Sequence, residues 1–557
     1  MTQVTKKLIP VLFAALVLAV LWVSAPTAQA QGPDTGPIDK GHSDAFIAPD
    51  LPTTGGANTN GPSVATNTSI TPTYYQTSEY MAGSVAVGIV LVESDGSIDP
   101  STEDWTDAEK QQVFDEIVAA LNWWAEMEPR ANLSFVYDDH FSNPLTTSVE
   151  PISRPHGDQK YWITDAMNAL GYDSPSYFTN VRDYVNDLRA TYQTNWAFTI
   201  FVVDSTADSN DSFSDGYFAY AYLGGPFMVM TYANGGHGPN NMGTVAIHEI
   251  GHIFYALDQY SNAQQTCTKR SGYLNVENQN SQYGDCSSDV SSVMRTPTAH
   301  VNDALDPYAA GQIGWRDSDG DGILDPLDTE LPINIGAVSV DGGSVTITGT
   351  AEIVPYPSPS RTSATINTLT SVQYRFNGGN WQQALADDST FDGTTEGFFF
   401  AESLSSGLYT MEVAAVDSAG NVSDIYATRT ITVIDPIDGG LNTELFLAGD
   451  ELVAGDVADS TILILGSAYH LQEGIVANVE YRIDGGSWQP ADAQDDTYNS
   501  NYEPFTAEIG SLEGGTHLIE ARATDSDGNV EVNVAAQEIT VASGVSVVFL
   551  PLVANNL

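Results

Sequence analysis

Long apolar runs mark the first half of the chain. Residues 84–92 (SVAVGIVLV) and 196–203 (WAFTIFVV) are near-continuous hydrophobic stretches of strand length, rich in β-branched and aromatic side chains. Such runs are typical of strands that are covered on both faces of a sheet. Residues 133–137 (LSFVY) predict a further strand. Together these stretches predict a sheet whose central strands are buried.

Helical periodicity lies between these runs. The stretch Thr106-Asp107-Ala108-Glu109 has the capping-box pattern that opens a helix, and Pro129 sets its end. The apolar positions of this helix fall on one face; they are Val113, Phe114, Ile117, Val118, Leu121 and Trp124. Residues 159–192 also have helical character. This alternation predicts an α/β (α+β) domain with a mixed, twisted sheet.

Two late strands complete the predicted sheet. Residues 217–222 (YFAYAY) alternate aromatic residues with alanine, and the turn Gly224-Gly225-Pro226 leads into residues 227–232. One of these strands is a candidate edge strand. An open strand edge can pair with an extended peptide, so residues 217–232 are predicted to line a substrate cleft.

The pattern after Leu331 becomes all-β and contains an internal repeat. Residues 371–381 (SVQYRFNGGNW) match residues 478–488 (NVEYRIDGGSW), and residues 413–421 match residues 521–529 around a shared DSxGN turn. The NGG and DGG triplets between alternating stretches are hairpin turns. The matching stretches are about 107 residues apart. A repeat of this length predicts two β-sandwich modules. Both modules resemble bacterial immunoglobulin-like domains.

Length and composition predict several domains and a strongly acidic surface. A chain of 557 residues with 42% hydrophobic residues is too long for one core. It carries 72 acidic and 18 basic residues, a formal net charge of −54. Such a charge repels nucleic acid and anionic membranes, so neither is expected as a partner. Most of these carboxylates are predicted to form a solvated surface.

The N-terminal segment predicts export. Lys6 and Lys7 precede an apolar run over residues 8–23, and Ala28-Gln29-Ala30 supplies small residues for cleavage. We therefore predict a signal peptide over residues 1–30 and a secreted, extracellular protein. No other apolar run is long enough to span a bilayer, so no stable membrane insertion is expected after cleavage.

The export prediction bears on the leader and on the cysteines. The stretch after residue 31 is rich in Gly, Pro, Thr, Ser and Asn, which predicts a disordered leader or pro-segment over residues 31–76. Cys267 and Cys286 are the two cysteines of the chain. In an oxidising compartment they are expected to form a disulfide, which would stabilise the fold by about 3 kcal/mol.

The candidate chemistry lies in residues 248–258 (HEIGHIFYALD). A helix that starts after Asn240 and Asn241 and runs to Leu257 would place His248 and His252 on one face, a single turn apart. Two imidazoles at this spacing can bind one Zn²⁺. The intervening Glu249 can act as a general base on a water molecule at the metal.

A catalytic zinc also needs a third protein ligand, for which Asp258 is the nearest candidate in the sequence. Asp258 stands where metzincin metallopeptidases carry their last ligand in HExxHxxGxxH. The Asp258-Gln259-Tyr260 ending is similar to that of snapalysin-like peptidases. Residues 291–295 (SSVMR) resemble the methionine turn beneath the metzincin zinc, which implies a structural role for Met294. The resemblance implies a metzincin-like fold and a zinc endopeptidase.

The resemblance departs from the family at Tyr255, where metzincins carry a glycine. Tyrosine resists the left-handed backbone conformation that glycine adopts freely. If the helix continued straight, Asp258 would rotate away from the histidines. Glu277 is then the competing third ligand, as in gluzincin peptidases. His140, His156, His237 and His300 lack motif spacing and are not predicted as ligands.

A second metal site is predicted directly after this domain. Residues 317–328 (DSDGDGILDPLD) have the spacing of an EF-hand-type loop, with glycine at its sixth position. The predicted Ca²⁺ ligands are Asp317, Asp319, Asp321, the Ile323 carbonyl, Asp325 and Asp328. The loop resembles the calcium loops of thrombospondin type 3 and dockerin modules. The alternative is an acidic linker.

These features predict a multidomain protein. Its expected parts are the signal peptide (1–30), the leader (31–76), a zinc metallopeptidase domain (77–316), a calcium-binding linker (317–330), immunoglobulin-like β-sandwiches (333–435 and 440–542) and a C-terminal tail (543–557). The predicted function is hydrolysis of peptide bonds in protein substrates, with Zn²⁺ and Ca²⁺ as cofactors. The sandwiches would serve as spacers or in attachment to a cell surface or matrix. An adhesin with a structural or inactive zinc site is the alternative.

Overall fold

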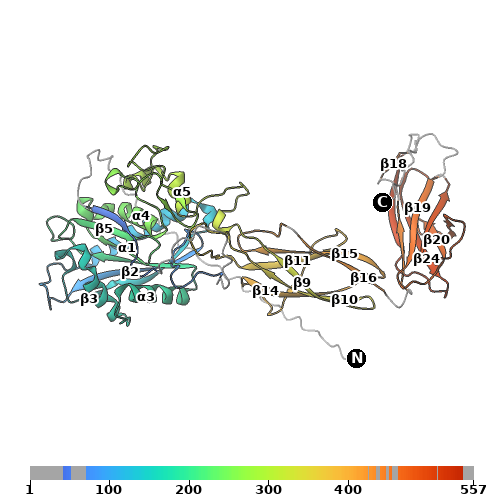
Figure 1. Cartoon of the computed structure of the whole chain (residues 1–557), viewed down its shortest axis with the longest axis horizontal. Helices are drawn as coiled ribbons and strands as arrows, with labels where there is room; N and C mark the ends of the chain where they lie inside the picture. The colour runs from blue at the N-terminus through green and yellow to red at the C-terminus, as the bar shows by residue number, and fades with distance from the viewer. Residues whose placement is uncertain are drawn as a thin grey trace, which may run out of the picture. The chain divides into compact units, whose positions relative to one another are not determined.

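The first folded domain is built on a six-stranded sheet in the computed structural model of the chain (Figure 1). The structure describes residues 42–51, 70–424, 426–434, 440–446, 451–453, 462–510 and 512–542. The predicted signal peptide and C-terminal tail lie outside these ranges. The strand order is β1-β5-β6-β4-β2-β3. The strands are β1 (His42–Phe46), β2 (Ser84–Ser94), β3 (Ser134–Thr147), β4 (Trp196–Val203), β5 (Tyr217–Tyr222) and β6 (Phe227–Thr231).

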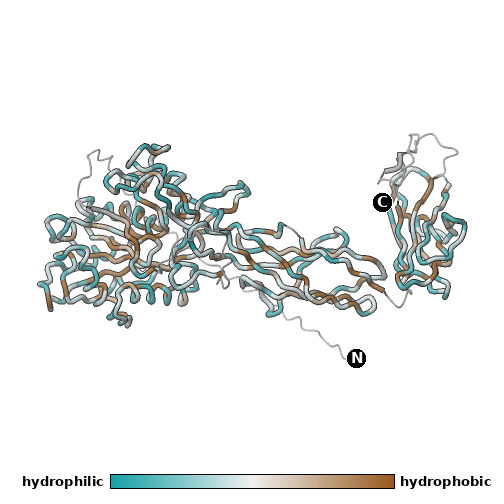
Figure 2. Tube along the Cα trace, viewed as in Figure 1, coloured by the Kyte–Doolittle hydropathy of each residue, from teal (hydrophilic) through white to brown (hydrophobic). Residues whose placement is uncertain are grey.

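The sheet is mixed, as the sequence predicts. Strands β5 and β6 are antiparallel. The other neighbouring pairs are parallel. Strands β4 and β6 are buried along their whole length, which agrees with their continuous apolar runs. In Figure 2 the hydrophobic positions follow the strands, and the hydrophilic positions follow the connecting loops.

Helices cover both faces of this sheet. Val85, Val87, Ile89 and Leu91 of β2 share a core with α1 (Asp107–Met127) and α4 (Met242–Ile253). The alternate residues of β2 share the opposite core with α2 (Gln159–Ala169) and α3 (Tyr177–Tyr192). Helix α1 starts with the predicted capping box, in which the Thr106 N–H donates to Glu109 and the Glu109 N–H donates to Thr106. A short helix, α5 (Pro307–Gln312), follows later in the chain.

The prediction of a disordered leader over residues 31–76 was wrong for strand β1. Residues His42–Phe46 pair in parallel with β5, and the Leu223 N–H donates to the Phe46 carbonyl. Strand β5 therefore has a hydrogen-bonded neighbour on each side, β1 on one and β6 on the other. The predicted cleft strand is not an open edge, because a segment from the leader covers it.

Two β-sandwich modules follow, as the repeat predicts (Figure 1). The first has sheets β13-β14-β10-β9 and β12-β11-β15-β16, and the second has sheets β17-β19-β23-β22 and β18-β25-β24-β20-β21. The strands of the first are β9 (Ile333–Asp341), β10 (Ser344–Glu352), β11 (Leu369–Phe376), β12 (Gln382–Gln383), β13 (Leu385–Ala386), β14 (Thr395–Ser403), β15 (Gly407–Asp417) and β16 (Ala427–Val433). Those of the second are β17 (Leu441–Leu445), β18 (Glu451–Val453), β19 (Ile462–His470), β20 (Val476–Ile483), β21 (Gln489–Pro490), β22 (Asp492–Ala493), β23 (Tyr502–Ile509), β24 (Gly515–Asp525) and β25 (Ala535–Ala542).

The repeated sequence stretches form equivalent structures in the two modules. Arg375 stacks over Trp381 at 4.4 Å, and Arg482 stacks over Trp488 at 4.5 Å. Both DSxGN stretches are tight turns closed by an aspartate that accepts from an asparagine four residues later. Among the described residues, no helix is long and apolar enough to cross a membrane.

Candidate metal centre

Helix α4 carries both histidines of the motif in the interior of the α/β domain. Every residue from Met242 to Ile253 is buried. Helix α1 holds it in place, since the Trp124 indole N–H donates to the Ile247 carbonyl at 3.1 Å. The helix ends at Ile253, four residues before the predicted Leu257. Asn241 precedes it, but its side chain makes no capping hydrogen bond.

Three candidate ligand atoms face one another at this helix. The Nε2 atoms of His248 and His252 are 3.2 Å apart. Oδ1 of Asp258 lies 3.0 Å from the first and 3.1 Å from the second. Ligands about 2.0–2.1 Å from a tetrahedral Zn²⁺ are separated by about 3.3 Å. The donor atoms therefore have the spacing and the chemistry that a zinc ion requires.

The opposite ring nitrogens are held by the protein backbone. Nδ1 of His248 lies 2.8 Å from the Val293 carbonyl, and Nδ1 of His252 lies 2.6 Å from the Ala256 carbonyl. A carbonyl accepts only from a protonated nitrogen, so these contacts place a proton on Nδ1 of each ring and direct both Nε2 atoms towards the centre. Metal-binding histidines are commonly oriented in this way.

Asp258 reaches the histidines because the chain turns sharply after α4. Tyr255 has φ of 75°, in the left-handed region. The Tyr255 N–H donates to the His252 carbonyl and the Ala256 N–H donates to the Gly251 carbonyl, both at 2.9 Å. This is a Schellman ending, which usually has glycine at the position of Tyr255. The helix therefore ends where the family glycine would end it, with tyrosine in that position.

The surroundings of Asp258 favour its ionised form. Burial by itself raises the pKa of this carboxyl group. Attraction to His252 and hydrogen bonds with both histidines outweigh burial and hold the pKa well below its usual range. Its second oxygen, Oδ2, is buried and makes no hydrogen bond among the described residues. A buried carboxylate with an unused oxygen is a further feature that suits a cation.

Glu249 follows His248 on α4 and is fully buried. In sequence it directly follows His248 and precedes His252 by three residues. Gly251, in the last turn of α4, lies close to Met294. A β-carbon at Gly251 would lie 2.6 Å from the Met294 sulfur. The Met294 carbonyl accepts from the Gln259 N–H at 2.9 Å. Met294 thus packs against α4 and the turn that follows it.

The segment between Asp258 and Met294 is closed by the predicted disulfide, which the structure confirms. Cys267 and Cys286 are bonded, with Cα atoms 5.3 Å apart. Glu277, the competing ligand, lies in the short hairpin of β7 (Arg270–Ser271) and β8 (Val276–Glu277). Its carboxylate accepts from Arg270 at 2.6 Å. Among the described residues it does not join the cluster of His248, His252 and Asp258.

The other histidines have different partners. His140 lies 2.9 Å from Asp138, and His156 lies 2.6 Å from Asp215. His300 contacts the Pro297 carbonyl, and the ring of His237 lies 5.5 Å from that of Phe218. None of them joins a cluster of three metal-binding groups within the described part of the chain.

The predicted calcium loop brings part of its ligand set together. Carboxylate oxygens of Asp317, Asp319 and Asp321 lie within 4.8 Å of one another. Gly322, the glycine at the sixth position, has φ of 99°, as the sharp turn requires. Asp325 points elsewhere, because it accepts from the Ser318 N–H and hydroxyl at 2.7 Å.

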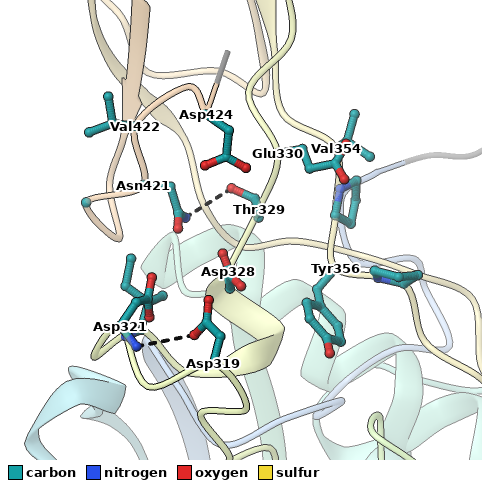
Figure 3. A pocket seen from close by; sticks show the side chains of 14 residues that line it. Asp319, Asp321, Asp328, Thr329, Glu330, Val354, Tyr356, Asn421, Val422 and Asp424 are labelled. Atoms are coloured by element: carbon teal, nitrogen blue, oxygen red, sulfur yellow. Dashed lines mark hydrogen bonds between the residues drawn. The ribbon is translucent and has the colours of Figure 1, made fainter.

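Asp328 lies beside this cluster in a pocket of about 440 Å³ (Figure 3). The pocket is formed by the loop, including Asp319, Asp321 and Ile323, and by Asn421 and Asp424 of the first sandwich. Burial and repulsion from Asp321 and Asp319 raise the pKa of Asp328. The fit to Ca²⁺ is therefore partial: Asp317, Asp319 and Asp321 meet, Asp328 adjoins them, and Asp325 would have to rotate.

Several groups at the candidate centre have no signal in the sequence. The carbonyls of Val293 and Ala256 fix the histidine rings, but any residue type supplies a carbonyl. The ring of Tyr260 lies 6.1 Å from that of His248. Its place two residues after Asp258 is the one available signal for it. Arg361, which contacts Tyr255, comes from the first β-sandwich.

The solved structures that are similar to part of this chain include fibronectin-like, S-layer and Intimin domains. No protein-family model and no curated protein match the chain. The fibronectin(III)-like modules of Clostridium thermocellum CbhA are 18% identical, with a TM-score of 0.14, over 38% of this chain and 94% of theirs. Domains 5–6 of the S-layer protein SbsC are 10% identical, with a TM-score of 0.14, over 38% and 97%. The D00–D0 domain of Intimin is 15% identical, with a TM-score of 0.16, over 38% and 100%. At these scores the matches carry no argument about function.

Proposed function

We propose that this protein is a secreted zinc-dependent endopeptidase of metzincin type that hydrolyses peptide bonds in protein substrates. One observation carries the proposal. The Nε2 atoms of His248 and His252 and Oδ1 of Asp258 converge within 3.2 Å of one another, while both Nδ1 atoms are held by backbone carbonyls. Glu249 lies on the same helix as the two histidines, directly after His248.

The residues of the centre divide into ligands and a proton carrier. His248, His252 and Asp258 would hold the zinc ion, which as a Lewis acid makes water nucleophilic near neutral pH. Glu249 accepts the proton of the attacking water and returns it to the nitrogen of the leaving amine. Three protein ligands would leave room at a bound zinc ion for water or substrate, as in catalytic zinc sites.

A peptide substrate fits the proposal at strand β5. Strand addition supplies backbone hydrogen bonds to an extended peptide whatever its side chains. β1 occupies the outer edge of β5, and Ala45 of β1 packs against the cluster formed by Leu223, Tyr255 and Leu257, which includes the turn that leads to Asp258. A peptide that pairs with β5 must therefore displace β1. In this proposal the leader segment competes with substrate.

The mechanism predicts a separation between metal binding and turnover. Glu249→Gln keeps all three ligands, so it should retain zinc at the level of the parent chain. It should lose about 10²–10⁴-fold in kcat/KM for a quenched peptide, since it removes the general base. Zinc content by mass spectrometry and hydrolysis of the peptide measure the two effects. Full activity in this variant would exclude the mechanism.

The third ligand is tested by a matched pair of carboxylate variants. Asp258→Asn should lower both zinc content and activity, because the amide removes a negative charge from the centre. Glu277→Gln should leave both unchanged, since that carboxylate pairs with Arg270. The reverse result would assign the gluzincin-type ligand set.

The alternative is a surface-binding protein with a structural or inactive zinc. A structural site has four protein ligands and no open position. The described residues bring three candidate ligands together, which favours the enzyme. We further propose that the loop over residues 317–328 binds Ca²⁺ and that the β-sandwiches act as spacers or attach the enzyme to a cell surface or matrix.

A further inference from the structure

A segment of the first β-sandwich contacts the α/β domain directly. It comprises residues 353–368, between strands β10 and β11, and is called the bridging segment here. The equivalent link in the second module, between β19 and β20, is limited to residues 471–475. The extra length is therefore not required by the sandwich fold itself.

Hydrogen bonds with Tyr273 fasten the bridging segment to the α/β domain. The Tyr273 hydroxyl donates to the Tyr356 carbonyl at 2.6 Å and accepts from the Ala364 N–H at 3.1 Å. The Ser358 hydroxyl donates to the Tyr273 carbonyl at 2.6 Å. These bonds are made by backbone groups and buried or half-buried side chains, so the position of the segment is closely defined.

Arg361 is the residue of this segment that reaches the turn. Its guanidinium lies over the ring of Tyr255, 4.1 Å from the ring centroid, and donates to the Tyr255 hydroxyl. It also forms a two-pronged ion pair with Glu79, whose side chain is 1% exposed; one of these bonds is 2.8 Å long. Arg361 therefore joins a buried carboxylate to the ring of Tyr255.

The hydroxyl end of the tyrosine ring is also confined. A β-carbon added at Gly224 would lie 2.0 Å from the Tyr255 hydroxyl, so only glycine leaves room for it. The Ser271 hydroxyl donates to the Tyr255 carbonyl at 2.6 Å. The side chain and carbonyl of Tyr255 are thus held while its backbone adopts the left-handed conformation.

We propose that Arg361 is a positioning residue for the candidate zinc centre. By holding the Tyr255 side chain, it offsets the penalty of the left-handed conformation, which for a non-glycine residue is about tenfold in population (about 1.4 kcal/mol). Tyr255 in turn sets the chain direction that brings Asp258 to His248 and His252. The first β-sandwich then completes the site. The consequence for zinc rests on the proposed function.

A double-mutant cycle on the full-length chain tests this role. Arg361→Met replaces arginine with an unbranched apolar side chain, so the aliphatic part is kept and the charge and the hydrogen bonds are lost. We expect about tenfold weaker zinc binding, measured by competition with a chelating dye. In the Tyr255→Gly background the turn has no left-handed penalty, so Arg361→Met should cause no further loss.

The controls separate positioning from general destabilisation. Arg375→Met removes a comparable arginine, stacked on Trp381 and paired with Glu412 within the same sandwich. It should leave zinc affinity unchanged. Glu79→Gln combined with Arg361→Met avoids a buried unpaired carboxylate and should still weaken zinc binding. An equal loss in the Tyr255 and Tyr255→Gly backgrounds would mean that Arg361 acts only by fastening the domains.

A second readout does not depend on zinc. Hydrogen exchange of the metal-free chain over residues 254–260 reports the two backbone hydrogen bonds that form the turn, donated by the Tyr255 and Ala256 N–H groups. Arg361→Met should accelerate this exchange, and Arg375→Met should not. If the parent chain takes up no zinc, the proposed function falls and the exchange result still decides the inference. Unchanged exchange together with unchanged zinc affinity would overturn it.

Discussion

Glu150 illustrates how single carboxylates are placed in the α/β domain. It is buried and accepts from the Thr102 N–H at 3.0 Å. Burial, followed by repulsion from Glu93 and Glu103, raises its pKa to about 7. Burial also raises the pKa values of Glu93, Glu103 and Asp204. This group of acids therefore costs stability when it is ionised.

The raised pKa of Glu150 makes a signed prediction. The folded state binds a proton more readily than the unfolded chain, so the penalty is complete above about pH 7 and disappears towards the ordinary value of 4.5. Glu150→Gln keeps an oxygen for the Thr102 N–H and removes the charge. It should raise the melting temperature at pH 8 by a few degrees, and this gain should vanish near pH 5. The exposed control Glu126→Gln should show no such trend, and a gain that is constant with pH would contradict the explanation.

At the scale of elements, local patterns predicted most of the fold. The apolar runs gave β4 and β5 with their observed bounds, and the capping box gave the start of α1. Strand β3 continues to Thr147, well past the apolar run that ends at Tyr137. Its polar residues pair with β2 at the sheet edge, where burial is not required. Strand β1 was missed for the same reason, because edge pairing needs backbone groups more than apolar side chains.

The candidate centre could likewise be predicted only in part from local sequence patterns. Helical spacing predicted that His248 and His252 share a face, since the periodicity of a helix is local. The approach of Asp258 depends on the conformation of Tyr255, whose partner Arg361 is 106 residues away in the sequence. Such a distant contact leaves no local pattern, so the sequence alone left Asp258 and Glu277 as alternatives.

Strand β1 provides a prediction at this scale. Ala45→Pro removes an N–H and strains the β1 backbone, so β1 should leave the edge of β5. If substrate pairs with β5, kcat/KM for a peptide should rise severalfold, mainly through a lower KM. Ala45→Ser keeps the N–H and serves as the control. Unchanged kinetics in a variant whose β1 peptide has lost exchange protection would show that substrate binds elsewhere.

At the scale of the whole molecule, carboxylates of two domains meet in one pocket where the α/β domain joins the first sandwich. Residues 317–328 belong to the α/β side of the pocket in Figure 3, and Asn421 and Asp424 belong to the first sandwich. The structure brings carboxylates of both together without a cationic residue in the pocket lining. A divalent ion there would reduce the repulsion that raises the pKa of Asp328.

Calcium should therefore stabilise the intact protein. A ligand present at 100 times its Kd and bound by the folded state alone adds about 2.7 kcal/mol. Calorimetry with added Ca²⁺ should show a higher melting temperature for the parent chain, and Asp319→Asn combined with Asp321→Asn should abolish the gain. Asp495→Asn, an exposed acid of the second sandwich, is the control. Equal gains in all three proteins would place the calcium effect outside the loop.

The buried Glu79 has a practical consequence for fragments of this protein. A protein shortened at residue 330, where the composition changes, would keep this carboxylate and lose the arginine that neutralises it. Its α/β domain would then carry an uncompensated anion in the interior and an unsupported strained tyrosine. Gene fusions and expression trials should accordingly retain the sequence to the end of β16 at Val433. Exchange of modules is better attempted beyond that point.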